Sequence, residues 1–343
     1  MKTRKVKIGK LHIGGGSPIS VQSMTNTDTK DVKATVAQIN QLEDAGCEII
    51  RVAVPDMESA KALKEIRQEI NIPLVGDIHF DYRLALEAAK HVDKLRINPG
   101  NIGDEEKISK VVFVAKEYSL PIRIGVNLGS LEKDMEARLG LTAGAMVESA
   151  KRHIEILEKN DFHDIVVSLK ASDVNKTIEA NRLFSKWHDY PLHLGITEAG
   201  TAFTGTINSS VGMGILLSQG IGDTIRVSLS GDPVEEVRAG WQILKALGLR
   251  QRGVSVIACP TCARNDIDVA AIAKELEEKT AGIKKPMKIA VMGCSVNGPG
   301  EAKEADLGVV GAGEKVLLYK DGKVIDKIEE KDIISTLLKE IGG

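Results

Sequence analysis

The chain has 343 residues, of which 43% are hydrophobic and 27% charged, and its formal net charge is −2. These values are typical of a globular protein with one large and one smaller domain, and the near-neutral charge argues against broad nucleic-acid binding. No apolar stretch is long enough to span a membrane, and no apolar segment of a secretion signal follows the basic N-terminus.

The first segment of the chain is expected to form a short hairpin. Val6–Ile8 and Leu11–Ile13 are its predicted strands, and Gly14-Gly15-Gly16 follows them. This triple glycine lacks the Lys-Ser/Thr pair of a phosphate-binding P-loop and no helix follows directly, so we expect a plain turn.

From Ile19 onward, short aliphatic runs alternate with amphipathic stretches, which predicts parallel strands joined by helices. The predicted strands are Ile19–Gln22, Ile49–Ala53, Leu74–Asp77, Lys94–Ile97, Ile122–Val126, Ile165–Leu169, Leu192–Ile196 and Thr224–Leu229. The predicted helices are Val32–Ala45, Met57–Ile70, Tyr82–His91, Glu105–Tyr118, Ala145–Lys159, Val174–Trp187, Ile207–Gln219 and Val234–Leu247.

The number of these units indicates the fold. Eight strand–helix units predict a closed (β/α)8 TIM-type barrel. The alternative is an open doubly wound sheet, but the dinucleotide fingerprint common after its first strand is missing here. Aspartates stand where helix N-caps are expected, at Asp31, Asp81, Asp104, Asp173 and Asp232.

The barrel pattern ends around Leu249–Gly253, so we place a domain boundary near residue 251. Residues 1–251 are expected to form the barrel and residues 252–343 a small α/β domain. The strands predicted for the second domain are Val254–Ala258, Lys288–Met292, Leu307–Val310, Lys315–Tyr319 and Lys323–Ile325. Its predicted helices are Ile267–Lys279 and Asp332–Ile341, and Asp321-Gly322 predicts a hairpin turn.

Polar side chains concentrate where the predicted barrel strands end, which is where barrel enzymes place their chemistry. These candidate residues are Arg51, Asp77, His79, Arg96, Asn98, Arg123, Asn127, Ser168, Lys170, Thr197, Glu198, Arg226, Ser228 and Ser230. Residues two apart in a strand face the same side, so Arg96 and Asn98 are expected to point into the barrel mouth together.

Five of these residues are cationic and come from five different strands. A guanidinium in an aliphatic strand is costly to bury unless an anion meets it. Asp77 and Glu198 are the obvious carboxylates nearby, too few to neutralise five cations. We therefore expect a pocket for a doubly charged or diphosphate-bearing substrate. The alternative is that individual arginines pair with acidic residues on neighbouring loops.

Two of the candidates could transfer protons. Glu198, if it lies inside a cationic and partly dry pocket, would be a general acid or base; alternatively it forms a salt bridge to Lys170 or Arg226. His79 would either position a ligand by a hydrogen bond or transfer a proton. Cys47, just before the second strand, is expected to be a small buried residue.

The remaining three cysteines form the second candidate site. Cys259 and Cys262 are spaced as CxxC, and Cys294 lies in a glycine-rich loop. A structural zinc site usually needs four Cys or His ligands, but all seven histidines lie at or before His193. An iron–sulfur cluster tolerates an unusual fourth ligand, and Glu301 is the nearest oxygen donor. We favour a cluster, with a zinc site and a redox pair or structural thiols as alternatives. Four cysteines in 343 residues do not make a disulfide scaffold, and they fit a reducing cytoplasm.

Motifs along nearly the whole chain resemble the 4-hydroxy-3-methylbut-2-enyl diphosphate synthase family of the non-mevalonate isoprenoid pathway, in its compact bacterial two-domain form. They are Val21–Thr27, Arg96–Asn101, Arg123–Asn127, Gly195–Gly200, Cys259–Cys262 and Cys294–Glu301. The resemblance implies a two-electron reductive ring opening and dehydration of 2-C-methyl-D-erythritol 2,4-cyclodiphosphate, with electrons supplied by reduced flavodoxin or ferredoxin.

The resemblance also implies roles for individual residues. Cys259, Cys262, Cys294 and Glu301 would bind one 4Fe–4S cluster, with Glu301 exchanging for a substrate oxygen. The five cationic residues would hold the diphosphate, helped by Asn98, Asn127 and Ser228, and Asp77, His79 and Thr197 complete the expected binding site. Glu198 would handle protons, and Asn297 would reach the substrate from the cluster side.

Finally, the resemblance implies a cytoplasmic homodimer in which the cluster domain of one chain faces the partner's barrel.

Two alternative functions stay open. The first is a zinc-stabilised TIM-barrel lyase or isomerase that acts on a phosphorylated small molecule through acid–base chemistry. The second is a non-enzymatic iron–sulfur sensor or scaffold whose barrel binds an anionic metabolite.

Overall fold

The computed structural model describes residues 2–98, 102 and 105–342. The chain divides into two compact units, Met1–Arg250 and Gln251–Gly343, which we describe separately. The predicted Asp104 cap and the Pro99–Asn101 part of one motif lie outside the described residues.

The first unit is built on an eight-stranded sheet, and its neighbouring strands are parallel. The strands in sheet order are β8 (Ile165–Lys170), β7 (Ile122–Asn127), β6 (Lys94–Ile97), β5 (Leu74–Asp77), β4 (Ile49–Ala53), β3 (Ser20–Met24), β10 (Thr224–Ile225) and β9 (His193–Leu194). A parallel bridge between Val167 of β8 and Leu192, just before β9, joins the two ends. The TIM-type barrel is therefore confirmed.

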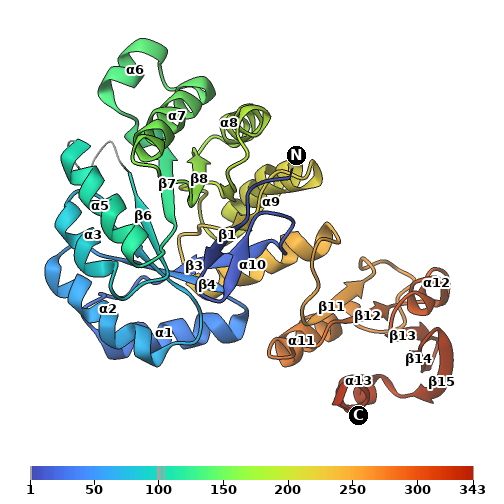
Figure 1. The fold of residues 1–343 in the computed structure, drawn as a ribbon. Coiled ribbons are helices and arrows are strands. Elements are labelled where there is room, and N and C mark those ends of the chain that lie inside the picture. The colour runs from blue at the N-terminus through green and yellow to red at the C-terminus, as the bar shows by residue number, and fades with distance from the viewer. Residues whose placement is uncertain (1, 99–101, 103–104, 343) are drawn as a thin grey trace. The chain divides into compact units, whose positions relative to one another are not determined.

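Helices surround the strands (Figure 1). They are α1 (Val32–Ala45), α2 (Met57–Glu69), α3 (Tyr82–Ala88), α5 (Glu105–Glu117), α6 (Lys133–Leu139), α7 (Ala143–Lys159), α8 (Val174–Trp187), α9 (Ala202–Ser218) and α10 (Pro233–Ala246). Four predicted caps are confirmed, because Asp31, Asp81, Asp173 and Asp232 each accept a hydrogen bond from a first-turn backbone amide. Helix α6 is an addition that the sequence did not predict.

The last two barrel strands are shorter than predicted, at two residues each. Beyond β9 the backbone turns, since Glu198 has a φ of 51° and Gly200 a φ of 118°. Beyond β10, the Arg226 amide still donates to the carbonyl of Leu194 at 3.0 Å. The aliphatic pattern continues past the point where the ladder stops, so the pattern overstated the strand lengths.

A hairpin closes one end of the barrel interior. Strands β1 (Val6–Ile8) and β2 (Leu11–Ile13) pair antiparallel, as predicted. Ile8 and Ile13 form a buried cluster with Ile49 and Val75, which lie at the beginnings of β4 and β5. The amino-terminal end of the barrel is therefore filled with apolar side chains, which leaves the carboxyl-terminal end for a site.

The second unit is a five-stranded sheet in the order β11 (Val254–Ala258), β12 (Met287–Met292), β13 (Leu307–Ala312), β14 (Lys315–Lys320) and β15 (Lys323–Ile328). The first three strands are parallel and the last two antiparallel. Helices α11 (Val269–Thr280) and α13 (Ile333–Gly342) share one buried cluster with the sheet, and α12 (Gly298–Lys303) contributes to another. Because Ile289 and Ala290 belong to different clusters, the two clusters lie on opposite faces of β12.

Among the described residues, none of the helices combines the length and the apolar character needed to cross a membrane.

Candidate functional site

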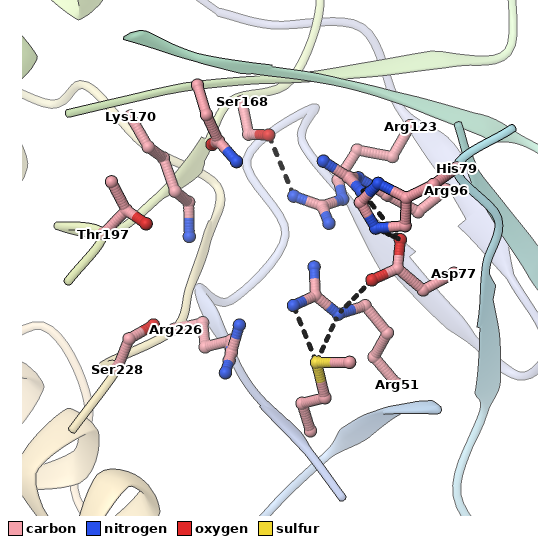
Figure 2. Close-up of a pocket in the computed structure, with 12 residues that line it drawn as sticks. Arg51, Asp77, His79, Arg96, Arg123, Ser168, Lys170, Thr197, Arg226 and Ser228 are labelled. Carbon is pink, nitrogen blue, oxygen red and sulfur yellow. Dashed lines mark hydrogen bonds and ion pairs between the residues drawn. The ribbon is translucent and has the colours of Figure 1, made fainter. Parts of the chain in front are cut away.

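The carboxyl ends of the barrel strands surround a pocket of about 280 Å³. Figure 2 shows its cationic side chains directed toward a common centre. The pocket is lined by Met24, Arg51, Asp77, His79, Arg96, Arg123, Asn127, Ser168, Lys170, Thr197, Arg226 and Ser228. All of these except Met24 were candidates from the sequence, so the strand-end pattern located most of the lining.

The strand register explains why these side chains meet. Arg96 of β6 and Arg123 of β7 are register partners, as are Asn127 of β7 and Lys170 of β8. Alternation along each strand then directs successive inward side chains to the same end of the barrel.

Two glycines provide the space that the long cationic side chains occupy. A Cβ atom on Gly125 would lie 2.7 Å from Arg96 Nε, and one on Gly195 would lie 2.5 Å from Lys170 Nζ. Another residue at these positions would displace the two cations, and at position 195 its Cβ would also lie 2.4 Å from the backbone oxygen of Arg226. The glycines in the Arg123–Asn127 and Gly195–Gly200 motifs therefore have a packing reason tied to the pocket.

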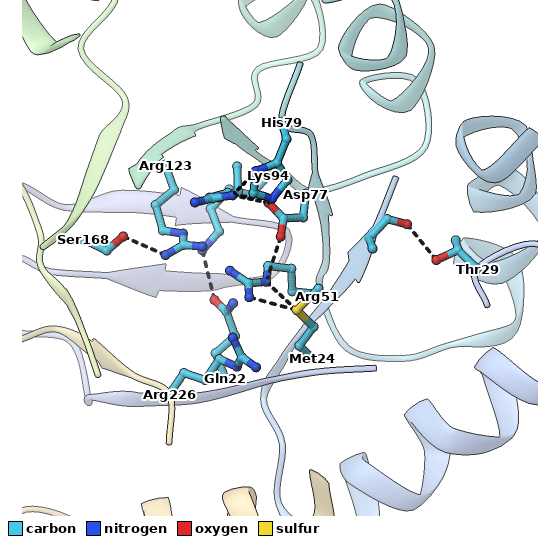
Figure 3. A network of polar contacts seen from close by, with 12 residues as sticks. Gln22, Met24, Thr29, Arg51, Asp77, His79, Lys94, Arg123, Ser168 and Arg226 are labelled. Carbon is cyan, nitrogen blue, oxygen red and sulfur yellow. Dashed lines mark hydrogen bonds and ion pairs between the residues drawn. The ribbon is translucent and has the colours of Figure 1, made fainter. Parts of the chain in front are cut away.

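Asp77 is the carboxylate at one side of the pocket, and Figure 3 shows it between Arg51 and His79. Its Oδ1 accepts a hydrogen bond from Arg96 Nη1 at 2.9 Å, and its Oδ2 lies 3.5 Å from Arg51 Nε. His79 Nε2 lies 3.4 Å from the same carboxylate. Although burial acts to raise the pKa of Asp77, Arg51, His79 and Arg96 hold it well below its ordinary value. Asp77 is therefore ionised and orients the cations beside it.

Arg123 is the most deeply buried cation of the pocket, with 1% of its surface exposed. Its Nη1 donates to Ser168 Oγ at 2.9 Å, while its Nε and Nη2 have no hydrogen-bond partner within the described part of the chain. Burial, and then Arg51 and Arg96, lower the pKa of Arg123. A buried guanidinium with unpaired donors is what a site for a multiply charged oxyanion requires.

Lys170 and Arg226 lie across the pocket from Asp77 (Figure 2). Burial lowers the pKa of the Lys170 ammonium well below its ordinary value, and Arg123 and Arg226 add to this effect. Arg226 Nε lies 3.8 Å from Oε2 of Glu236, a carboxylate of α10 that is 6% exposed. An anionic ligand would therefore relieve the mutual repulsion of these cations.

The sequence reasoning missed three contributors to this region. Met24 Sδ lies 2.8 Å from Arg51 Nη2, and Lys94 is wholly buried with Nζ 3.5 Å from Gln22 Oε1 (Figure 3). Glu236 lies on the buried face of α10 beside Val237 and Gly240. A carboxylate on an otherwise apolar helix face was the signal that could have identified it.

Several predicted site residues lie outside the pocket lining. Asn98 is buried just beyond β6, and Asn297 and Glu301 belong to the second unit. Glu198 follows the pocket residue Thr197, but its side chain is exposed. Glu198 therefore does not lie inside the cationic, partly dry pocket in which its acid–base role was predicted, because its left-handed backbone carries it out of the strand direction. No ion pair joins it to Lys170 or Arg226, all three being described residues.

Cys47 behaves as predicted. Its side chain is 2% exposed, and burial raises the pKa of its thiol to about 12. A thiol of this kind is unreactive and serves packing.

The other three cysteines lie on two neighbouring loops of the second unit. Cys259 follows β11 and Cys294 follows β12, and these strands are parallel neighbours, so both loops leave the same edge of the sheet. The Gly293 amide donates to Cys259 Sγ at 3.1 Å, and the Asp266 amide donates to the Gly293 carbonyl at 2.7 Å. Two hydrogen bonds donated by backbone amides, one of them to the Cys259 sulfur, thus hold the CxxC loop and the Cys294 loop together.

This donor set fits a thiolate-bound cluster. Cys259, Cys262 and Cys294 are free thiols, and none of them is fully buried. Asn297 precedes α12, whose first turn carries the exposed Glu301. Within residues 2–98, 102 and 105–342, however, no three His, Cys, Asp or Glu side chains are grouped so that they could hold a metal ion. The structure brings the two loops together without gathering the four predicted ligands.

Solved structures share the barrel. The chain superposes on dihydropteroate synthase from Yersinia pestis with a TM-score of 0.51 and 14% identity, covering 71% of this chain and 98% of that one. Type I 3-dehydroquinate dehydratase from Clostridium difficile gives a TM-score of 0.51 and 19% identity, covering 72% and 97%. At these identities the likeness establishes the fold alone.

Sequence comparisons are more specific. Residues 3–241 match the GcpE TIM-barrel domain, and residues 255–343 match the GcpE protein C-terminal domain. The chain is 60% identical over 341 residues to 4-hydroxy-3-methylbut-2-en-1-yl diphosphate synthase (flavodoxin) of Caldanaerobacter subterraneus subsp. tengcongensis, covering 99% of this chain and 96% of that protein. The Clostridium perfringens protein of the same name is 56% identical, with 99% and 98% covered. The chain therefore belongs to the GcpE family.

Proposed function

We propose that this chain is an iron–sulfur oxidoreductase that converts 2-C-methyl-D-erythritol 2,4-cyclodiphosphate into 4-hydroxy-3-methylbut-2-enyl diphosphate, a step of non-mevalonate isoprenoid biosynthesis. The proposal is supported by family membership and by the names of relatives with which the chain shares more than half of its residues. The same observations do not favour the alternative, a zinc-stabilised lyase or isomerase.

The observation that carries the proposal is the charge of the barrel pocket. Arg51, Arg96, Arg123, Lys170 and Arg226 line it, whereas the buried carboxylates beside them are Asp77 and Glu236. This surplus of positive charge suits a diphosphate, because guanidinium groups match phosphate oxygens in geometry as well as in sign.

We assign the remaining pocket residues by their positions. Asn127, Thr197 and Ser228 line the pocket and can donate to or accept from the hydroxyl and phosphate oxygens of the substrate. Asp77 and His79 fix the guanidinium of Arg96. Asn98 supports the same strand end from its buried position, and Glu198, at the exposed edge beyond Thr197, is proposed to handle protons.

The overall reaction defines what the second unit must add. Two electrons and one proton convert the dianionic cyclodiphosphate into a trianionic linear diphosphate and water, and no side chain of the pocket supplies those electrons. A 4Fe–4S cluster bound by Cys259, Cys262, Cys294 and Glu301 would supply them one at a time when present. Asn297, at the start of α12, would face the substrate from that side.

Three finer proposals accompany the reaction. Reduced flavodoxin, which the relatives' name includes, or ferredoxin is the electron donor. The protein acts in the cytoplasm. It works as a homodimer in which the cluster unit of each chain serves the barrel of its partner. The apolar side chains that α9 exposes at intervals of one turn, Phe203, Ile207 and Val211, support self-association.

The reaction is tested with protein purified and reconstituted without air. We expect the cyclodiphosphate to be consumed and the linear diphosphate to form when reduced flavodoxin is supplied. A reconstituted, iron-containing protein that leaves the cyclodiphosphate unchanged with both flavodoxin and a chemical reductant would contradict the function.

The dimer arrangement is tested by mixing two inactive variants, Cys294→Ser and Arg123→Met. If one chain's cluster serves the partner's barrel, mixed dimers regain one working site and activity returns. If the cluster serves its own barrel, the mixture stays inactive.

A further inference from the structure

The carboxylate of Glu236 is the feature of the pocket region that the proposed reaction does not use. Glu236 lies on α10, outside the barrel, yet it is 6% exposed and its Oε2 lies 3.8 Å from Arg226 Nε. This separation is too long for a hydrogen bond but close enough for a substantial charge interaction in a buried setting.

Two hydrogen bonds hold the carboxylate in this position. The Leu229 amide donates to Oε1 at 2.9 Å, and Ser23 Oγ donates to Oε2 at 3.3 Å. Leu229 directly follows the pocket residue Ser228, so Glu236 is fixed to the same strand end that carries Arg226. Burial raises the pKa of Glu236, whereas Arg226 and the Leu229 and Ser23 donors oppose this rise and favour the charged form.

The two buried carboxylates of the pocket differ in how their charge is used. Asp77 accepts a hydrogen bond from Arg96 and also lies beside Arg51 and His79, so three groups share its charge. Glu236 has a single cationic neighbour within 4 Å in the described part of the chain, Arg226. Arg226 Nε is itself buried and has no hydrogen-bond partner among the described residues. Glu236 thus balances one guanidinium without a direct hydrogen bond to it.

We propose that Glu236 is a counter-charge that competes with the bound diphosphate for Arg226 and thereby limits how tightly the pocket holds its product. The inference rests on the proposed diphosphate chemistry of the pocket. In the free protein, Glu236 compensates part of the charge of Arg226. When a diphosphate binds, the same guanidinium faces two anions, and their repulsion weakens the complex.

If Glu236 competes with the diphosphate, loss of its charge changes the diphosphate affinity in the opposite direction from that expected if Glu236 only positions Arg226. Removing the carboxylate charge strengthens the binding of a diphosphate and slows its release, so the dissociation constant and KM fall. If Glu236 only held Arg226 in place, its loss would weaken binding and raise KM. The sign of the change in diphosphate affinity therefore separates the two roles.

The test is calorimetric titration of inorganic diphosphate into the full chain, comparing the wild type with Glu236→Gln. Glutamine retains the volume and the carbonyl acceptor for the Leu229 amide but has no charge. We expect roughly three- to tenfold tighter binding by the variant. The matched control is Glu235→Gln on the same helix turn, whose side chain pairs with Arg238 at 2.7 Å and is not part of the pocket; its affinity should equal that of the wild type.

A second variant covers the case in which Glu236→Gln does not fold. Glu236→Asp keeps the charge but draws it back from Arg226, and should bind diphosphate about twofold more tightly. Unchanged or weaker binding by a folded variant would overturn the role of Glu236 while leaving the diphosphate pocket intact. A wild-type protein that binds no diphosphate would overturn both.

Discussion

The candidate site residues of the first unit lie on strands or just beyond them, whereas those of the second unit lie mainly on loops. In the barrel, strand side chains form the pocket, and each cation is fixed by register, by neighbouring glycines or by Asp77. In the second unit, the cysteines lie on loops beyond β11 and β12, and the predicted ligands are not gathered around a centre. The chain alone forms the pocket built on strands, whereas under the proposed function a bound cluster would draw the ligands of the loop site together.

The proposed reaction needs two functions, binding of a polyanion and delivery of electrons, and the two units differ in which one they suit. Holding a polyanion requires charges fixed against their own repulsion, which a rigid barrel provides. Delivering electrons requires a group that the polypeptide does not contain, so the loops need only present thiolates. The following changes should therefore affect one unit without the other.

The largest effect is expected from Cys294→Ser. Loss of one thiolate should abolish cluster assembly and turnover, while affinity for inorganic diphosphate stays at the wild-type value because the pocket residues are untouched. Iron and sulfide analysis after anaerobic reconstitution measures the first effect and calorimetry the second. Cys47→Ser is the control, since this buried thiol is far from the ligand set in sequence and serves packing. A Cys294→Ser protein with full iron content would remove Cys294 from the ligands.

Glu198→Gln should lower kcat by roughly a hundredfold or more if this carboxylate transfers a proton. Because Glu198 is exposed and outside the pocket lining, diphosphate affinity and cluster content should stay unchanged. Steady-state kinetics with reduced flavodoxin gives kcat. Wild-type turnover in this variant would leave His79 as the proton donor among the predicted candidates.

Arg123→Met should weaken diphosphate binding by about 2 to 3 kcal/mol, or roughly 30- to 150-fold, because donors that the protein leaves unpaired are removed. The cluster should assemble normally. Arg152→Met on α7 is the matched control, since this exposed arginine pairs with Asp134 at 2.8 Å and lies outside the pocket. Equal affinities in the two variants would show that the anion binds elsewhere.

Lys94→Met should raise the free energy of unfolding by about 1 to 3 kcal/mol, because a wholly buried amine near other cations is replaced by an apolar side chain. Burial, and then Arg123 and Arg51, lower the pKa of Lys94 well below its ordinary value. The unfolded chain therefore binds a proton at Lys94 more tightly than the folded chain does, and this difference destabilises the fold. The destabilisation disappears as the pH rises toward about 10, where Lys94 is deprotonated in the unfolded chain as well.

The gain from Lys94→Met should accordingly be larger at neutral pH than in alkali. Denaturant titrations at several pH values measure this dependence. Lys90→Met provides the comparison, because Lys90 is exposed and paired with Glu87. A destabilised Lys94→Met protein would indicate that the amine has a stabilising role in the barrel interior.

The sequence predicted the barrel well because its signals were local. Aliphatic runs of strand length, amphipathic helices and aspartate caps each act within a few residues, and β4, β5, β6, α1, α8 and β11 have the predicted bounds. The shortened β9 and β10 were missed because ladder pairing depends on neighbouring strands. Helix α12 was missed because Gly298 and Gly300 resemble a loop, although Pro299 suits a first helical turn.

For the site, the strand-end residues were predictable because a parallel barrel brings them to one mouth. Glu236 and Lys94 were not, because the first reaches the pocket from a helix and the second lies one inward position below Arg96 on β6. The exposure of Glu198 depends on a left-handed backbone turn that residue type alone does not reveal. In all three cases the position of the side chain depends on the folded backbone, which the residue type and its local pattern do not reveal.

The central claim is that the barrel alone forms the diphosphate site, independently of the cluster. Its most direct test is titration of inorganic diphosphate into full-length chain prepared without iron. We predict saturable binding at one site per chain, weakened by Arg123→Met and unaffected by Cys294→Ser. An iron-free, folded chain that shows no binding, or binding that Cys294→Ser removes, would contradict the claim.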